Sequence, residues 1–257
     1  MKHLTTEVDD KKAYILPIGD LHIGDKSFKG EAYKKLMGYL KWVDETPEAR
    51  IFLNGDIFNC ASRLSKTSPF ETDSNEYIQA VEIFKPYRDR IIGAIDGNHE
   101  ARMMDMFGVS PTQHFCMALD IPYAGWSALV ELKVLKRKNN RASHRQIYYL
   151  YFHHTTGGGG TLGSKMNRVA KLREIIEGID VYCGSHNHQL GAMPLDVFYP
   201  APTSKEGIGK RRMWFVDCGG YVGWEGSYAE KSMLSPSRIG SPRIRFDGQH
   251  HDIHVSI

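Results

Sequence analysis

The segment Asp96-Gly97-Asn98-His99-Glu100 places an amide, an imidazole and a carboxylate side by side, directly after the apolar run of residues 90–95. If that run is a buried strand, these groups lie at its carboxyl end, which is the edge of an open α/β sheet where ligands bind. Taken alone, Asn and Gly are ordinary turn residues. The segment becomes informative because other strand-like runs end in side chains of the same kinds.

The other apolar runs lead into Asp20-x-His22, Gly55-Asp56, His153-His154 and His186-x-His188. Residues i and i+2 of an extended segment point to the same side, so we expect Asp20 and His22 to share one ion. By the same reasoning, His186 and His188 are expected to face one pocket.

These candidate ligands are carboxylates, imidazoles and an amide oxygen, without thiolates, and such donors suit Mn²⁺, Fe, Zn²⁺ or Ni²⁺. There are too many donors for one ion. They fit two ions roughly 3.5–4 Å apart, bridged by a carboxylate and a water.

The elements that must position these residues alternate along the first part of the chain. Apolar spacing predicts strands at residues 13–19, 50–53 and 90–95, with helices at 30–45 and 74–89. This β-α-β-α-β order predicts parallel neighbouring strands joined by right-handed crossovers.

The pattern is looser after residue 100. We expect helical material at 100–119, an extended stretch at 123–135 and a charged hairpin tip at 136–141. A strand at 146–152, a flexible Gly-rich loop at 157–160, a helix at 166–177 and a short strand at 180–183 are expected next. The rest, from 190–197 and 211–217 to the end, is expected to form β-hairpins. No domain linker is evident, so we predict a single domain, 1–257, with a motif core at 13–190. The β-rich part 190–257 is expected to complete the second sheet.

Composition sets limits on the class of protein. The 257 residues, 41% of them hydrophobic, can bury the core of one α/β domain. A net charge of +3 permits anionic partners without requiring nucleic acid. The cysteines form no Cys-x-x-Cys pair and are expected to be reduced. Neither a signal peptide nor a membrane span is evident, so a cytoplasmic location is expected.

Taken in order, the motifs resemble those of the calcineurin-like metallophosphoesterase family. The matching blocks are Gly19-Asp20-Leu21-His22, Asn54-Gly55-Asp56-Ile57-Phe58-Asn59, Gly97-Asn98-His99-Glu100, Phe152-His153-His154 and Gly184-Ser185-His186-Asn187-His188. The resemblance implies an α/β fold in which two β-sheets form a sandwich flanked by helices, a four-layer α/β/β/α arrangement with the site at the sheet edge.

The resemblance also implies roles for individual residues. Asp56 would bridge two metal ions. Asp20, His22 and His188 would complete the first metal site, and Asn98, His153 and His186 the second. His99 would not bind metal and would act on the leaving group as a general acid or as an electrostatic partner of the phosphate.

The motif blocks depart from the family pattern at two positions and leave the choice of one ligand open. Asn59 stands where the second block often has Asp, and we expect it beside the ligands rather than among them. Ser185 separates Gly184 from His186, which requires a slightly different turn. Either His153 or His154 could be the ligand. The family pattern favours His153, and His154 would then line the pocket.

Two further residues are expected near the site. Glu100 is predicted to orient a neighbouring imidazole, because histidines that bind metals usually have such a partner. Arg102 could pair with Glu100 or could reach a substrate phosphate, for which its planar fork is suited.

These features predict a hydrolase that acts on phosphate esters, as a phosphomonoesterase or a phosphodiesterase. Two divalent cations, with Mn²⁺ preferred, would activate a bridging water that attacks phosphorus as hydroxide. The alternative is a nuclease acting on DNA or RNA, weakly favoured by the basic stretch 136–145 and by Lys205, Lys210, Arg211 and Arg212. A non-catalytic metal-binding scaffold is a third reading, which the intact ligand set disfavours. The sequence does not indicate the oligomeric state.

Overall fold

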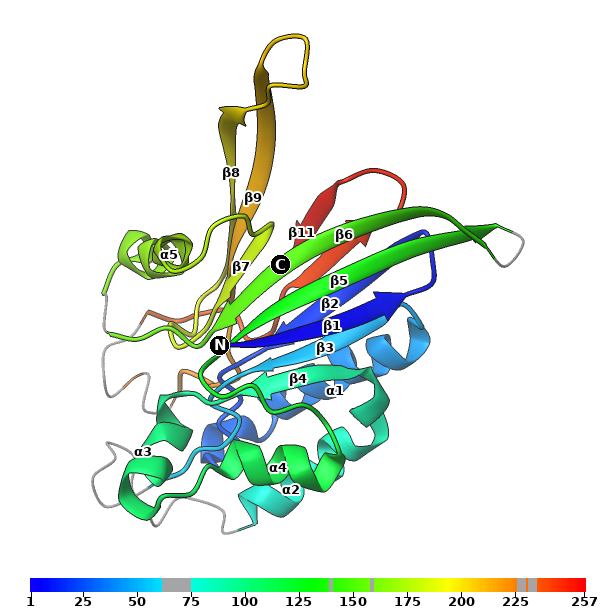
Figure 1. Cartoon of the computed structure of the whole chain (residues 1–257). Helices are drawn as coiled ribbons and strands as arrows, with labels where there is room; N and C mark the ends of the chain where they lie inside the picture. Colours follow the sequence, from blue (N-terminus) through cyan, green and yellow to red (C-terminus); the bar gives the residue numbers. More distant parts are fainter. Residues whose placement is uncertain (62–74, 139–140, 158–159, 226–229, 231–234) are drawn as a thin grey trace.

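The computed structural model describes residues 1–61, 75–138, 141–157, 160–225, 230 and 235–257, and it contains two mixed β-sheets packed face to face (Figure 1). The five-stranded sheet has the order β11 (Ile253–Ser256), β10 (Arg243–Asp247), β2 (Lys12–Ile18), β3 (Ala49–Asn54), β4 (Ile91–Ile95). The six-stranded sheet has the order β1 (Lys2–Val8), β5 (Ser127–Lys138), β6 (Arg141–His153), β7 (Val181–Gly184), β9 (Ile208–Cys218), β8 (Leu190–Pro200).

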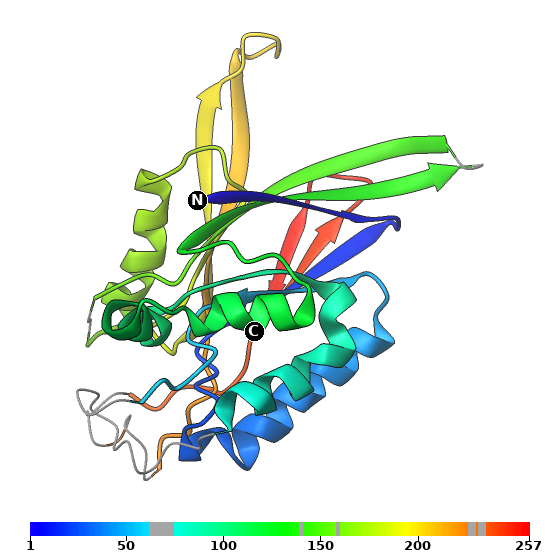
Figure 2. The same cartoon turned by 60° about the horizontal axis from the view of Figure 1, so that its bottom comes forward.

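Helices cover the outer faces of both sheets. The helices are α1 (Glu31–Glu45), α2 (Glu76–Phe84), α3 (Asn98–Phe107), α4 (Pro111–Leu119) and α5 (Leu162–Lys171), with short 3₁₀ turns at Lys26–Phe28, Lys85–Arg90 and Leu172–Glu174. Helices α1 to α4 lie on the side of the five-stranded sheet, and α5 lies against the six-stranded sheet (Figures 1 and 2). The predicted sandwich flanked by helices is confirmed.

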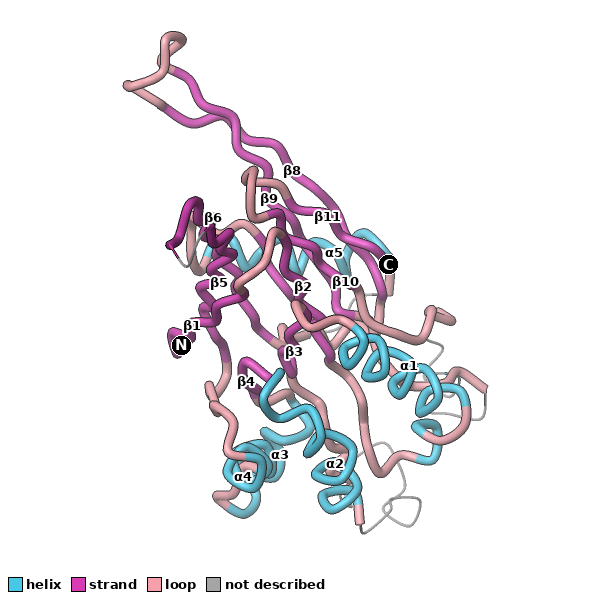
Figure 3. Tube along the Cα trace, turned by 90° about the vertical axis from the view of Figure 1, so that its right-hand side faces the viewer, coloured by secondary structure: helices cyan, strands magenta, loops and turns pink. Residues whose placement is uncertain are grey.

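Three apolar cores hold the layers together. The first lies between the five-stranded sheet and its helices, where Leu53 packs with Leu36 of α1 and Phe115 of α4. The second fills the space between the sheets, and in it the rings of Phe52 and Phe152 stack with centroids 3.8 Å apart. The third joins the six-stranded sheet to α5 and contains Tyr151, Tyr182, Phe215, Val169 and Leu172. Figure 3 shows the strands of the sandwich beside the helices of the first core.

The predicted β-α-β-α-β unit is present. Strands β2, β3 and β4 are parallel neighbours, and their carboxyl ends therefore meet at one edge of the sheet. In the other sheet, β6 and β7 are also parallel. The ends of these strands are the places where the candidate ligands occur.

Some elements differ from the sequence predictions. Strand β1 was not predicted, and it pairs in parallel with β5 along its full length. Helix α5 begins at Leu162 rather than at residue 166, because Thr161 and Ser164 form a capping box at its start. The C-terminal part contributes strands to both sheets, β8 and β9 to one and β10 and β11 to the other.

None of the helices in the described part of the chain combines the length and apolar character needed to cross a bilayer.

Candidate metal centre

The candidate ligands converge where strands of the two sheets end. Asp20 and His22 follow β2, Asp56 follows β3, Asn98 begins α3 after β4, His154 follows β6, and His186 and His188 follow β7. The side chains of Asp20, His22, Asp56 and His154 are all less than 5% exposed. Residues separated by more than a hundred positions therefore share one buried site.

Several of these residues adopt an unusual backbone conformation. Asp20, His22, Asp56, His186 and His188 have φ values of 51°, 49°, 49°, 76° and 50°, in the left-handed region that non-glycine residues rarely occupy. Asp20 and His22 are thus not the extended pair that we predicted, although both face the site. Such strain persists only where the surroundings enforce it, and it occurs preferentially at functional sites.

Backbone hydrogen bonds hold the first two loops against each other. The N–H of Asp20 donates to the carbonyl of Gly55 at 3.1 Å, and the N–H of His22 donates to the carbonyl of Asp56 at 3.0 Å. The N–H of His186 donates to the Asp20 carboxylate at 2.8 Å. The strained loops therefore fix each other.

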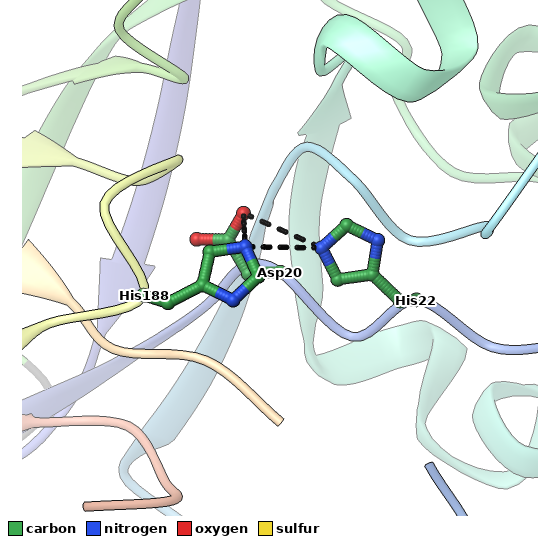
Figure 4. Close-up of side chains that lie close together, drawn as sticks. All are labelled: Asp20, His22 and His188. Atoms are coloured by element: carbon green, nitrogen blue, oxygen red, sulfur yellow. Dashed lines mark hydrogen bonds and ion pairs between the residues drawn. The ribbon is translucent and has the colours of Figure 1, made fainter. Parts of the chain in front are cut away.

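The first group of side chains contains Asp20, His22 and His188 (Figure 4). The Nε2 atoms of His22 and His188 face each other at 3.2 Å, and they lie 3.9 Å and 3.6 Å from Oδ1 of Asp20. That oxygen is buried and has no hydrogen-bond partner among the described residues. All three donor atoms thus point at one spot.

The second group contains Asp56, His154 and His186, joined by Asn98. His154 Nε2 lies 3.2 Å from Oδ2 of Asp56 and 3.2 Å from Oδ1 of Asn98. His186 Nδ1 lies 2.6 Å from the same Asn98 oxygen. This arrangement brings together an amide oxygen, a carboxylate and two imidazoles.

Asp56 belongs to the second group and also faces the first. Its Oδ2 is 3.8 Å from His22 of the first group and 3.2 Å from His154 of the second. A single carboxylate can therefore reach both positions, as expected of a bridging ligand.

These donors fit divalent cations. Ligand atoms about 2.0–2.2 Å from an ion are separated from one another by about 3–3.5 Å, close to the spacings found here. The mixture of imidazole nitrogen with carboxylate and amide oxygen suits first-row divalent metals. The unpartnered Oδ1 of Asp20 is the atom that a cation would most directly satisfy.

The structure places His154, rather than the favoured His153, among the candidate ligands. His154 is 3% exposed and lies within the second group. His153 lies outside both groups, and its Nδ1 accepts a hydrogen bond of 2.7 Å from the backbone N–H of Thr155. His154 is thus the residue placed to bind metal.

The pKa shifts favour neutral imidazoles at His22 and His188 and a protonated imidazole at His154. Burial lowers the pKa of His188 to about 3 and also lowers the pKa of His22. Burial by itself would lower the pKa of His154, but the Asp56 and Asp20 carboxylates and the Asn54 carbonyl together outweigh it and raise that pKa to about 10. Nδ1 of His154 donates to the carbonyl of Asn54 at 2.9 Å, so its Nε2 would release a proton on binding a cation.

His99 lies at the rim of the ligand cluster. Its Nδ1 donates to the backbone carbonyl of Asn59 at 2.6 Å, and its Nε2 lies 3.9 Å from Oδ2 of Asp56. A carbonyl only accepts, so Nδ1 carries a proton and Nε2 faces the cluster. Burial lowers the pKa of His99, although the charge of Asp56 opposes this effect.

Glu100 has a different role from the predicted one. Its buried carboxylate accepts hydrogen bonds from the backbone N–H groups of Asp56, Phe58 and Gly97, at 3.0, 2.9 and 2.8 Å. Orientation of an imidazole by Glu100 was therefore the wrong expectation. Glu100 instead joins the loop after β3 to the start of α3.

Asn59 lies beside His99, next to the candidate ligands. It is 2% exposed, and its backbone carbonyl orients His99. Arg102 does not pair with Glu100, and two of its guanidinium nitrogens are buried without a partner among the described residues. Gly158 and Gly159 of the predicted flexible loop lie outside the described residues.

The structure adds supporting residues that sequence reasoning did not identify as such. Asn187, between the two histidines of its loop, donates to the buried carboxylate of Asp217 at 2.9 Å and accepts from Arg168 at 3.3 Å. Asn54 donates to Oγ of Ser185 at 2.7 Å, which fixes the residue inserted before His186. The position of Asn187 between two candidate ligands was the available signal.

Comparisons with known proteins give matches only among solved structures. No protein-family model matches the chain, and no curated protein does. YfcE, a phosphoesterase from E. coli, is 13% identical, with a TM-score of 0.45 over 95% of this chain and 98% of that one. The calcineurin-like phosphoesterase YfkN from Bacillus subtilis is 12% identical, with a TM-score of 0.40 over 95% and 88%.

A third structure, the nuclease MPE from Pseudomonas putida, is 12% identical, with a TM-score of 0.37 over 94% of this chain and 87% of that one. Since identities and scores are this low, we draw the chemistry of this chain from its own side chains.

Proposed function

We propose that the chain is a hydrolase of phosphate esters that uses two divalent cations, with Mn²⁺ preferred. The observation that supports this proposal is the position of Asp56, whose Oδ2 lies within 3.8 Å of a donor from each ligand group. Asp20, His22, Asp56 and His188 would hold one cation. Asp56, Asn98, His154 and His186 would hold the other.

The cations would supply activation of a water molecule and neutralisation of the phosphate oxygens, which are the main needs of phosphoryl transfer. The protein would contribute by holding the metal ligands in position. Its strained loops and the hydrogen bond from the His99 N–H to Asp56 hold the ligands in place before substrate arrives.

His99 would deliver the proton to the leaving oxygen. Its Nδ1 proton is held by the carbonyl of Asn59, so only Nε2 is directed towards the cluster. In its protonated form, Nε2 would donate to the leaving oxygen, a role in which a positioned imidazole is effective.

Three of the basic residues that favoured a nuclease have acidic partners in the structure. Lys210 and Arg212 contact Asp196 at 2.8 and 2.7 Å, and Arg211 contacts Asp180 at 3.2 Å. Paired charges of this kind offer less to a nucleic-acid backbone. We therefore give preference to a phosphomonoesterase or phosphodiesterase.

A substrate panel tests the proposal. Metal-free protein would be reconstituted with Mn²⁺ and assayed on p-nitrophenyl phosphate, on bis-p-nitrophenyl phosphate and on labelled DNA, with His22→Ala as the inactive control. Hydrolysis of an ester that a chelator abolishes supports the proposal. If no substrate is hydrolysed faster than by the control, the remaining interpretation is a non-catalytic metal-binding scaffold. Cleavage of DNA that weakens steeply as salt rises would indicate a nuclease.

A further inference from the structure

Arg102 carries a charge for which the described residues provide no partner. It lies on α3, three residues after His99, and is only partly exposed. Its Nε and Nη2 are buried and make no hydrogen bond within the described part of the chain. By contrast, the part-buried Arg211 is paired with Asp180 at 3.2 Å.

Unpaired buried donors are unfavourable, the more so when the group is charged. The nearest obvious acceptor in sequence, Glu100, is already used by three backbone N–H groups. Each such unsatisfied group in a folded protein calls for an explanation. Binding of a ligand is one possible explanation.

The position of Arg102 directs its charge towards the site. Residues three apart on a helix share a face, and helical side chains lean towards the N-terminus of their helix. The N-terminus of α3 is Asn98, one of the candidate ligands, and His99 follows it. The charge of Arg102 acts to lower the pKa of His99 and the pKa of Cys60, the residue after Asn59.

We propose that Arg102 binds a second anionic group of the substrate, a phosphate carried by the leaving group. This inference rests on the proposed function, in which His99 serves the leaving oxygen. Three residues of helix advance by about 4.5 Å, so Arg102 lies just beyond His99, where the next phosphate of one molecule would lie. The planar fork of Arg is suited to that group.

Two kinds of substrate carry a phosphate on the leaving group, a nucleoside diphosphate and a nucleic-acid strand. Arg102→Ala and wild type would be compared on ADP and on a thymidine oligonucleotide, which carry a second phosphate, and on the two nitrophenyl esters, which do not. We expect kcat/KM to fall about 10- to 100-fold only for the phosphate-bearing substrate that wild type hydrolyses. Arg102→Lys should recover part of the loss, and Arg88→Ala, whose side chain is 54% exposed, is the control. An equal loss on all substrates, or no loss, would overturn the proposal.

Binding and stability give readouts independent of turnover. In a chelator, we expect AMP or the oligonucleotide to bind wild type more tightly than Arg102→Ala by at least tenfold. The thermal midpoint of Arg102→Ala should equal or exceed that of wild type, because an unpaired buried cation has been removed. A lower midpoint would indicate a structural residue and would contradict the proposal. If wild type hydrolyses none of the substrates, the proposed function fails, and the binding comparison still decides the role of Arg102.

Discussion

The carboxylate of Asp56 accepts a hydrogen bond of 2.8 Å from the backbone N–H of His99. This bond engages Oδ1 and leaves Oδ2 directed at His22 and His154. The residue proposed to bridge two cations is therefore fixed by the loop proposed to deliver the proton. The two functions share one rigid support, which favours preorganisation of the site.

Replacing Asp56 should remove both cations. We expect Asp56→Ala to retain fewer than one metal ion per chain and to lose at least about 100-fold in kcat, because both ligand groups lose their shared carboxylate. Elemental analysis of protein prepared without chelator measures the metal content. Asp89→Ala, whose side chain is 91% exposed, is the control. Two ions per chain in Asp56→Ala would contradict the bridging role.

His154 and His153 form a matched pair of variants. His154→Ala should lose about one metal ion per chain and most activity, since its Nε2 contacts both Asp56 and Asn98. His153→Ala should keep both ions and stay within about threefold of wild-type activity, a size typical of a change away from the ligands. Metal analysis and initial rates decide between them. The reverse ranking would restore the family-based choice of His153.

The adjacent histidines show where sequence reasoning stops. Leu150 and Phe152 of β6 face the core between the sheets, and alternation along the strand carries His154 to that same side. His153 continues the face of Tyr151, which packs towards α5. Periodicity indicates that the two histidines diverge, but only the packing of the sheets identifies which face holds the site.

The convergence of the other candidate ligands was predictable because their types and order define the chemistry. Asp20, Asp56 and His186 each follow a short apolar run, and parallel pairing brings such ends together. The left-handed backbone at these residues was not predictable, because only a few per cent of non-glycine residues adopt it, although Asp and His do so more often than most. Strand β1 escaped prediction because only Leu4 and Val8 among its residues are buried.

The imidazole of His99 should be needed for turnover and not for metal binding. We expect His99→Ala to keep two metal ions and to lower kcat by about 10²- to 10⁴-fold, the usual contribution of a general acid. The loss should be larger for an alkyl phosphate than for p-nitrophenyl phosphate, because nitrophenolate leaves readily without a proton. Steady-state kinetics on both esters with metal analysis provide the test. His99 also lies near His22 and Asp56, so loss of a metal in this variant would identify it as a ligand instead.

Glu100 should contribute mainly to stability. Its carboxylate is fully buried and accepts from three backbone N–H groups, so Glu100→Ala would leave three buried donors unsatisfied. At about 1–3 kcal/mol for each donor, we expect the free energy of unfolding to fall by at least about 3 kcal/mol. Urea denaturation in a chelator measures this without a contribution from bound metal.

Glu100→Gln gives the sharper comparison with that alanine variant. The amide oxygen can still accept the two bonds made to Oε2, while the amide nitrogen faces the N–H of Phe58, which also donates, so the loss should be intermediate. Glu45→Ala on α1, whose side chain is 64% exposed, is the control and should change stability by less than about 0.5 kcal/mol. A Glu100→Ala protein as stable as this control would show that the three N–H groups find other partners. The loop after β3 would then be positioned chiefly by its bonds to the loop after β2.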